Sequence, residues 1–271
     1  MSEPAAGRFD GRVVAITGAA RGIGEALGRA FLARGALLVA MDRHWDAGSA
    51  WHAELQSAGA LALDCDITDD AQVDAACDQA LARFGRIDVL VNNAAMRQRD
   101  LYPVAGACAV LDTQDADWER MFRVNVVGTL KVTRRFIRPM LVQRRGSVIN
   151  ISANGSLTHV VGEGVSAGNH PGLLNQPYDA SKAALTSLSF YLAEEVKGSN
   201  VAVNVVFPGA TRTTGSHALT EGREALGLRM ALLEAAHVLP VCLMLADADA
   251  SLTGRAYDVV PWNLARGHAG P

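Results

Sequence analysis

The chain has 271 residues, of which 49% are hydrophobic and 20% are charged, and its formal net charge is −3. This composition suits a folded α/β protein and excludes a largely disordered chain. A slightly acidic chain also does not fit a nucleic-acid binder that neutralises phosphates. No apolar run reaches the roughly 18 residues that span a bilayer, and the N-terminus lacks the apolar core of a signal peptide. We therefore expect a cytoplasmic protein that acts without a membrane partner.

Strands and helices alternate along the whole chain. The apolar run 12–17 predicts the first strand, helical spacing over 23–34 predicts the first helix, and the next strand is predicted over 36–41. Further strands are predicted near 60–63, 87–91, 147–151, 201–206 and 255–260. Further helices are predicted near 48–58, 69–84, 116–143, 178–197 and 228–246.

Most of these strands are unbroken apolar runs, which is typical of parallel strands covered by helices on both faces. The expected fold is a single α/β domain over residues 1–271, a Rossmann-like, doubly wound parallel sheet of about seven strands. Two long irregular stretches, 97–115 and 154–177, interrupt the pattern. Loops of this length are usually lids, binding loops or disordered segments. The second leaves the carboxyl end of a strand, so we expect it to help build a substrate pocket.

The residues TGAARGIG, 17–24, lie between the first strand and the first helix. Gly18, Gly22 and Gly24 let the backbone turn tightly and approach a ligand closely. The N–H groups and the dipole at the start of the following helix favour a pyrophosphate. The sequence therefore predicts a dinucleotide-binding turn, to which Arg21 and Ile23 also belong.

The second predicted strand stops at Asp42. The separation of Asp42 from the glycine turn is close to the roughly 20 residues expected of a ribose-binding acid. A carboxylate there accepts hydrogen bonds from ribose hydroxyls and repels a 2′-phosphate. We therefore expect NAD rather than NADP as the cofactor. Arg21 and Arg43, however, supply nearby positive charge, which favours NADP.

The stretch PYDASK, 177–182, places a tyrosine four residues before a lysine at the start of a predicted helix. Positions i and i+4 share a helix face, so Lys182 can lie beside Tyr178. A nearby ammonium group favours the phenolate and lowers the pKa of a tyrosine. We expect Tyr178, assisted by Lys182, to exchange a proton with a substrate hydroxyl while hydride moves between the same carbon and a nicotinamide.

These motifs together resemble those of the short-chain dehydrogenase/reductase family, and the likeness covers nearly the whole chain. Besides the glycine turn and YxxxK, the chain carries DCDIT at 64–68, NNAA at 92–95 where the family has NNAG, VNVVG at 124–128 and PG at 208–209. The further cofactor contacts that the resemblance implies are Asp66, Ile67, Asn92, Ala94, Pro208, Gly209, Thr211 and Thr213.

The resemblance also implies roles for individual residues. Asp66 would contact the adenine ring, and Thr213 would contact the nicotinamide carboxamide. Lys182 would also bond the nicotinamide ribose, and Asn125 would hold a water that links Lys182 to solvent. The family commonly forms dimers and tetramers through the helices that begin here near Asp117 and Tyr178, so we expect a homodimer or a homotetramer.

The family's catalytic serine has no direct counterpart, because Ala153 stands in its place in NISANGS, 150–156. Ser152 comes one residue early, and an unbroken strand would turn it to the opposite face. Three alternatives stay open: the strand ends or bulges here and brings Ser152 round, Asn154 or Ser156 substitutes, or the tyrosine works alone. A shifted register is a further alternative. Ser152 is the candidate that we carry forward.

The expected function is an NAD-dependent oxidoreductase that interconverts a small secondary alcohol and a ketone. A non-catalytic NAD-binding regulator on the same fold is one alternative, supported by Ala95 and Ala153. A lyase or an epimerase that uses the same tyrosine is another. We expect no bound metal, because the four cysteines and seven histidines show no metal-ligand spacing.

Overall fold

The structure of the protein is a computed structural model, in which residues 8–103, 107–153, 175–212 and 232–268 are described. Seven strands form one sheet in the order β3-β2-β1-β4-β5-β6-β9, and each pair of neighbours is parallel. The strands are β1 (Val13–Thr17), β2 (Leu37–Asp42), β3 (Leu61–Asp64), β4 (Val89–Asn92), β5 (Gly146–Ile151), β6 (Val201–Phe207) and β9 (Ala256–Asp258). The predicted single-domain α/β fold with a parallel sheet is confirmed.

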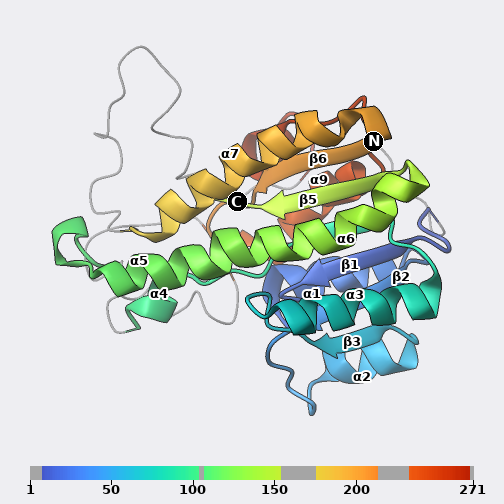
Figure 1. Ribbon diagram of the computed structural model, residues 1–271, viewed down its shortest axis with the longest axis horizontal. Helices are drawn as coiled ribbons and strands as arrows, with labels where there is room; N and C mark the ends of the chain where they lie inside the picture. The colour runs from blue at the N-terminus through green and yellow to red at the C-terminus, as the bar shows by residue number, and fades with distance from the viewer. Residues whose placement is uncertain (1–7, 104–106, 154–174, 213–231, 269–271) are drawn as a thin grey trace.

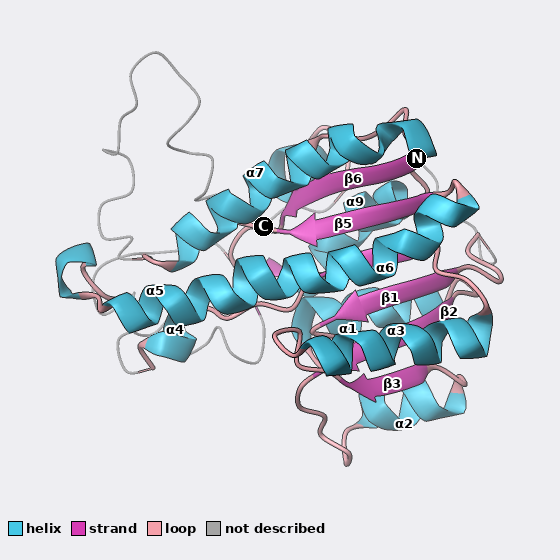
Figure 2. Cartoon of the chain, viewed as in Figure 1, coloured by secondary structure: helices cyan, strands magenta, loops and turns pink. Residues whose placement is uncertain are grey.

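Helices cover both faces of this sheet (Figures 1 and 2). The longer ones are α1 (Gly22–Leu32), α2 (Ala50–Ser57), α3 (Asp70–Phe84), α5 (Asp115–Phe122), α6 (Thr129–Gln143), α7 (Tyr178–Val196) and α9 (Leu239–Ala246). Two shorter helices are α4 (Gln98–Leu101) and α10 (Val259–Leu264). Within the described stretches, no helix combines the length and the apolarity that crossing a membrane requires.

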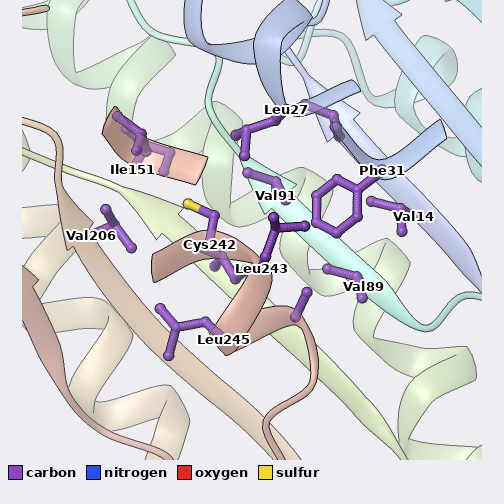
Figure 3. Close-up of a cluster of buried hydrophobic side chains, with 14 of the residues drawn as sticks. Val14, Leu27, Phe31, Val89, Val91, Ile151, Val206, Cys242, Leu243 and Leu245 are labelled. Atoms are coloured by element: carbon purple, nitrogen blue, oxygen red, sulfur yellow. The ribbon is translucent and has the colours of Figure 1, made fainter. Parts of the chain in front are cut away.

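Two hydrophobic cores lie on opposite faces of the sheet, and successive strand residues enter them in turn. On β1, Val14 and Ile16 pack in the core shared with α1, α2, α9 and α10, whereas Val13 and Ala15 belong to the core shared with α3, α6 and α7. Figure 3 shows the first core, where Phe31 of α1 lies near Val14 and Val89. Burial on both faces explains why the strands are unbroken apolar runs.

The chain near the C-terminus departs from the prediction. In place of a helix over 228–246, the described part has a short strand, β8 (Leu233–Glu234), a 3₁₀ turn and then α9. Pro240 explains the later start, because proline lacks an N–H group and belongs in the first turn of a helix. The strand predicted near 255–260 ends early, because the side chain of Asp258 accepts a hydrogen bond from Val260 N and caps α10.

Two further differences lie near the carboxyl edge of the sheet. The irregular stretch 97–115 contains α4 and a 3₁₀ turn, Val110–Asp112. The single helix predicted over 116–143 is interrupted between α5 and α6 by a π-helical segment, Arg123–Gly128. π-helical turns are rare and frequently lie at functional sites.

Candidate active site

The carboxyl ends of four adjacent strands bring the sequence motifs to one edge of the sheet. The glycine turn follows β1, NNAA follows β4, Ser152 follows β5 and the PG pair follows β6. In Figure 1 the strand arrows point toward the side on which α4 and the first turn of α7 lie. This edge is where open α/β sheets bind ligands.

The glycine turn has a backbone that requires glycine. Gly18 and Gly22 have φ angles of +65° and +63°, in the left-handed region that side chains disfavour. A Cβ atom on Gly18 would lie 2.8 Å from Ala94 Cα, and one on Gly24 would lie 2.1 Å from Gly18 O. The turn leads into α1, which has 11 residues and no side-chain cap at its N-terminus. This backbone fits the pyrophosphate of a dinucleotide.

The turn is held from behind by the segment that follows β4. The Asn93 side-chain amide donates to Thr17 O at 3.1 Å and to Gly18 O at 2.9 Å. Thr17 Oγ1 accepts hydrogen bonds from Asn93 N at 3.0 Å and from Ala94 N at 3.1 Å. Asn93 is not among the site residues that we predict from the sequence, although it lies inside the NNAA motif.

Alanine at position 95, where the family has glycine, brings no backbone strain. Among the described residues, the non-glycine positions with positive φ are Arg144 and Asn200. Ala95 is not one of them, so its backbone does not need the freedom of glycine.

Asp42 faces the glycine turn from the end of β2. Its Oδ2 accepts from Ala20 N at 3.0 Å, and its Oδ1 accepts from His44 N at 3.2 Å. Arg21 and Arg43 are both exposed. The carboxylate is therefore held against the turn, as a ribose-binding acid must be.

The other motifs on this side shape the edge of the sheet. Asp66 Oδ1 accepts from the backbone N and the hydroxyl of Thr68, both at 2.8 Å. Ile67 is buried against Gly128, where a Cβ atom would lie 2.9 Å from Ile67 Cγ1. Asn92 lies deeper, and its amide donates to Thr133 Oγ1 and Asn150 Oδ1, both at 2.8 Å.

The PG pair forms a second tight turn, after β6. Gly209 has a φ of +72°, and a Cβ atom there would lie 2.9 Å from Leu233 Cδ1. Thr211 Oγ1 donates toward Pro208 O and Gly209 O, at 3.4 and 3.3 Å. Thr211 begins β7 (Thr211–Arg212), which pairs with β8. Thr213 lies outside the described residues, as do Asn154 and Ser156.

Tyr178 and Lys182 lie together in the first two turns of α7. Lys182 is 2% exposed; its Nζ lies 5.8 Å from the centroid of the Tyr178 ring and donates to Ile151 O at 2.8 Å. Burial lowers the pKa of Lys182 to about 8. The geometry that YxxxK predicts, with both side chains on one helix face, is present.

The direction of the tyrosine shift is opposite to our expectation. Burial raises the pKa of Tyr178 above its usual value, and the negative charge of Asp179 adds to this effect. Of the nearby charges, Arg97 lowers the pKa and Asp100 raises it. Loss of hydration therefore outweighs the neighbouring charges in the protein alone.

Asn125 is fully buried in the π-helical segment and joins three parts of the site. Its Oδ1 accepts from Met96 N at 2.8 Å, and its Nδ2 donates to Met96 O and to Ser181 Oγ, both at 2.9 Å. The Ser181 hydroxyl in turn donates to Tyr178 O at 2.6 Å. Asn125 thus ties the segment after β4 to the first turn of α7.

Ser152 points at α7. Its Oγ lies 2.9 Å from both Lys182 O and Thr186 Oγ1, and the residue is 2% exposed. Its backbone N donates to Val206 O at 2.9 Å, which continues the ladder between β5 and β6. Of the alternatives for this position, a bulge is not present, because the hydrogen bonding between β5 and β6 continues to Ser152 just after β5 ends at Ile151.

The described residues contain no group of three or more His, Cys, Asp or Glu side chains that could hold a metal ion.

Comparison with known proteins agrees with this architecture. Residues 12–224 match the family model described as short chain dehydrogenase. The chain is 46% identical over 268 residues to a fluoren-9-ol dehydrogenase of Terrabacter sp. (strain DBF63), covering 97% of this chain and 74% of the relative. It is 33% identical to a meso-2,3-butanediol dehydrogenase of Serratia marcescens, covering 92% of each chain.

A solved structure agrees in fold. A short-chain type dehydrogenase/reductase from Mycobacterium marinum superposes with a TM-score of 0.76 at 25% identity, over 92% of this chain and 94% of the other. Two relatives of this identity and coverage, together with the family model, establish the family. The chain belongs to the short-chain dehydrogenases and is an oxidoreductase of that family.

Proposed function

We propose that the protein is an NAD-dependent dehydrogenase that interconverts a secondary alcohol and a ketone, with Tyr178 as the general acid/base. The observation that carries this proposal is the placement of Tyr178 and Lys182 on one face of α7, at the sheet edge that also holds the glycine turn. The name of the 46% identical relative makes an aromatic secondary alcohol such as fluoren-9-ol the first substrate to test.

In this proposal the protein positions the alcohol and removes its proton. A bound nicotinamide ring supplies the hydride acceptor. Ionised Tyr178 accepts the hydroxyl proton as the carbonyl forms, and in reduction the neutral phenol returns it. Because burial alone disfavours the phenolate, positive charge must offset it, and Lys182 and Arg97 are the cations at hand. Asn125 and Ser181 fix the first turn of α7, so the phenol stays in place.

Ser152 has a different role here from the one expected. Its hydroxyl is directed at the backbone of α7, where it contacts Lys182 O and Thr186. We assign it to supporting the turn that carries Lys182, and we assign binding of the substrate oxygen to the hydroxyl of Tyr178.

Asp42 supports the choice of NAD over NADP. Its carboxylate is held against the glycine turn by Ala20 N, so a 2′-phosphate would meet a negative charge there. Arg21 and Arg43 are exposed to solvent, where their charges are screened by salt.

The proposal is tested by incubating the protein with NAD or NADP and a panel of secondary alcohols, led by fluoren-9-ol, while the absorbance of the reduced nicotinamide is followed. We expect turnover, with kcat/KM at least about tenfold higher with NAD, which corresponds to about 1.4 kcal/mol. NAD binding without turnover of any alcohol would instead identify a regulatory protein. Conversion of substrate without accumulation of reduced cofactor would identify a lyase or an epimerase.

A further inference from the structure

An indole on α2 reaches the glycine turn. Trp51 is 2% exposed, and its Nε1 donates to the carbonyl oxygen of Ala19, inside TGAARGIG, at 2.9 Å. Ala19 itself has no exposed surface. A buried carbonyl needs a hydrogen-bond donor, and here the donor comes from a helix 32 residues further along the chain.

The carbonyl that Trp51 binds and the N–H group that Asp42 binds belong to one peptide unit. Asp42 Oδ2 accepts from Ala20 N at 3.0 Å, and this nitrogen forms the amide bond with the Ala19 carbonyl. A trans peptide is planar, so its C=O and N–H groups point in opposite directions. The indole and the carboxylate therefore fix the orientation of this peptide plane from its two sides.

The two preceding carbonyls of the turn are also bound by a side chain. The Asn93 amide donates to Thr17 O and Gly18 O, so that, with the bond from Trp51, three successive carbonyls have protein donors. Asn93 comes from the segment after β4, whereas Trp51 comes from α2. A pyrophosphate requires N–H groups rather than carbonyl oxygens to face it, and these bonds keep the carbonyls directed at the protein.

Trp51 is itself held in one position by α1. Gly28 leaves room for the indole, because a Cβ atom there would lie 2.7 Å from Trp51 Cζ2. The guanidinium carbon of Arg29 lies 4.8 Å from the centroid of the indole ring, and Arg29 is in turn ion-paired with Glu25 and Glu54. A side chain that packing locks in this way can orient the backbone group to which it bonds.

We propose that Trp51 is a positioning residue for dinucleotide binding, which orients the peptide between Ala19 and Ala20 and, through it, Asp42. This inference rests on the proposed dinucleotide function. Trp51 acts without touching the cofactor: its hydrogen bond holds the turn in the shape that receives the pyrophosphate. The N–H group of the same peptide holds the Asp42 carboxylate where ribose hydroxyls bind. A turn that is ordered in advance lowers the cost of binding.

The test is calorimetric binding of NAD and of ADP-ribose, which keeps the adenosine and the pyrophosphate and lacks the nicotinamide. Trp51→Phe removes the indole N–H, and we expect it to weaken both ligands by a similar factor of about 3 to 10, the net effect of one hydrogen bond. Trp118→Phe is the matched control. Trp118 Nε1 donates to Thr113 Oγ1 at 2.9 Å, outside the glycine turn, so this variant also loses an indole hydrogen bond and should keep both affinities.

Two readouts separate positioning from a general loss of stability. A purely structural loss lowers the fraction of folded protein, so calorimetry would count fewer binding sites per chain at an unchanged affinity. We expect Trp51→Phe to bind at full stoichiometry with lower affinity. In a double-mutant cycle, Trp51→Phe should also cost less affinity in the Asp42→Ala background than in the unmodified protein, because one peptide couples the two side chains.

Unchanged affinities in Trp51→Phe would overturn the proposal. A loss for NAD alone would also overturn it, because the turn serves the part that both ligands share, and so would additive effects of Trp51→Phe and Asp42→Ala. An unmodified protein that binds neither ligand would instead contradict the proposed dinucleotide function. Should Trp51→Phe fail to fold, replacing Trp51 by benzothienylalanine, which keeps the shape of the ring and lacks the N–H, decides the matter by the same two affinities.

Discussion

The pKa values of Tyr178 and Lys182 are both shifted toward their neutral forms. Burial raises the pKa of the tyrosine and lowers that of the lysine to about 8. At neutral pH the lysine with this pKa is still mainly an ammonium, whereas the tyrosine is held as the neutral phenol. Charges around the cleft must set the ionisation of Tyr178, and Arg97 and Asp179 act on it in opposite directions.

Because Arg97 and Asp179 shift the pKa of Tyr178 in opposite directions, replacing each should shift the pH profile in opposite directions. Oxidation of an alcohol requires ionised Tyr178, so kcat/KM should rise with pH until the tyrosine has titrated. Arg97→Gln removes a charge that lowers the pKa, so the rising limb should move to higher pH and kcat/KM at neutral pH should fall several-fold. Asp179→Asn removes a charge that raises the pKa, so its limb should move to lower pH. Movement of both limbs in the same direction would show that another group controls the profile.

At the scale of elements, the π-helical segment is the feature that connects the two sides of the site. It carries Asn125, whose amide bonds Met96 on one side and Ser181 on the other. Because Ser181 bonds Tyr178 O, the wide turn helps to set where α7 begins. The segment therefore positions the tyrosine without touching its hydroxyl.

Asn125 acts as a clamp between Met96 and Ser181. Replacing Asn125 should destabilise the protein more than replacing Ser181. Asn125→Ala leaves the partly buried Met96 N and Met96 O without their partner, so we expect the free energy of unfolding to fall by about 2–3 kcal/mol in urea titrations. Ser181→Ala removes one hydroxyl from the same network and should cost about 1 kcal/mol. An Asn125→Ala variant as stable as Ser181→Ala would contradict the role of Asn125 as a clamp.

Most helices and strands could be predicted from the sequence, for reasons that particular residues show. The glycine turn was predictable because close backbone approach at Gly18 and Gly24 excludes any side chain. Pro240 and Asp258 are also signals of helix starts, and they predict both of the C-terminal boundaries that the structure has. The π-helical turn could not be predicted from the sequence, because it coincides with hydrogen bonds from segments distant in the chain. The direction of the Tyr178 pKa shift could not be predicted either, because desolvation depends on tertiary burial.

At the scale of the whole molecule, buried ionisable groups make stability depend on pH. Cys242 lies in the core of α9, and burial raises its pKa to about 12. An unfolded thiol ionises above about pH 8.5, so the stability contributed by Cys242 is complete below that pH and falls as the pH rises. Lys182 behaves oppositely: its folded pKa of about 8 lies below the unfolded value of about 10.4, so its unfavourable contribution is relieved between these values.

Two variants separate these contributions. Between pH 8 and pH 10, the unmodified protein should lose about 2 kcal/mol of unfolding free energy relative to Cys242→Ala. Over the same range it should gain about 2 kcal/mol relative to Lys182→Met. Urea titrations at the two pH values measure both differences. Differences of the same sign for the two variants would contradict the pKa shift of one of the two groups.

The central claim is that the hydroxyl of Tyr178 transfers the proton in alcohol oxidation, and one matched pair of variants tests it most directly. Tyr178→Phe removes that hydroxyl, and Tyr191→Phe removes one from the same helix at a site that is 78% exposed. With NAD affinity verified by calorimetry in both, we predict that Tyr178→Phe lowers kcat by at least about 100-fold, within the usual contribution of a general base, while Tyr191→Phe stays active. Full activity of Tyr178→Phe with NAD bound would contradict the account.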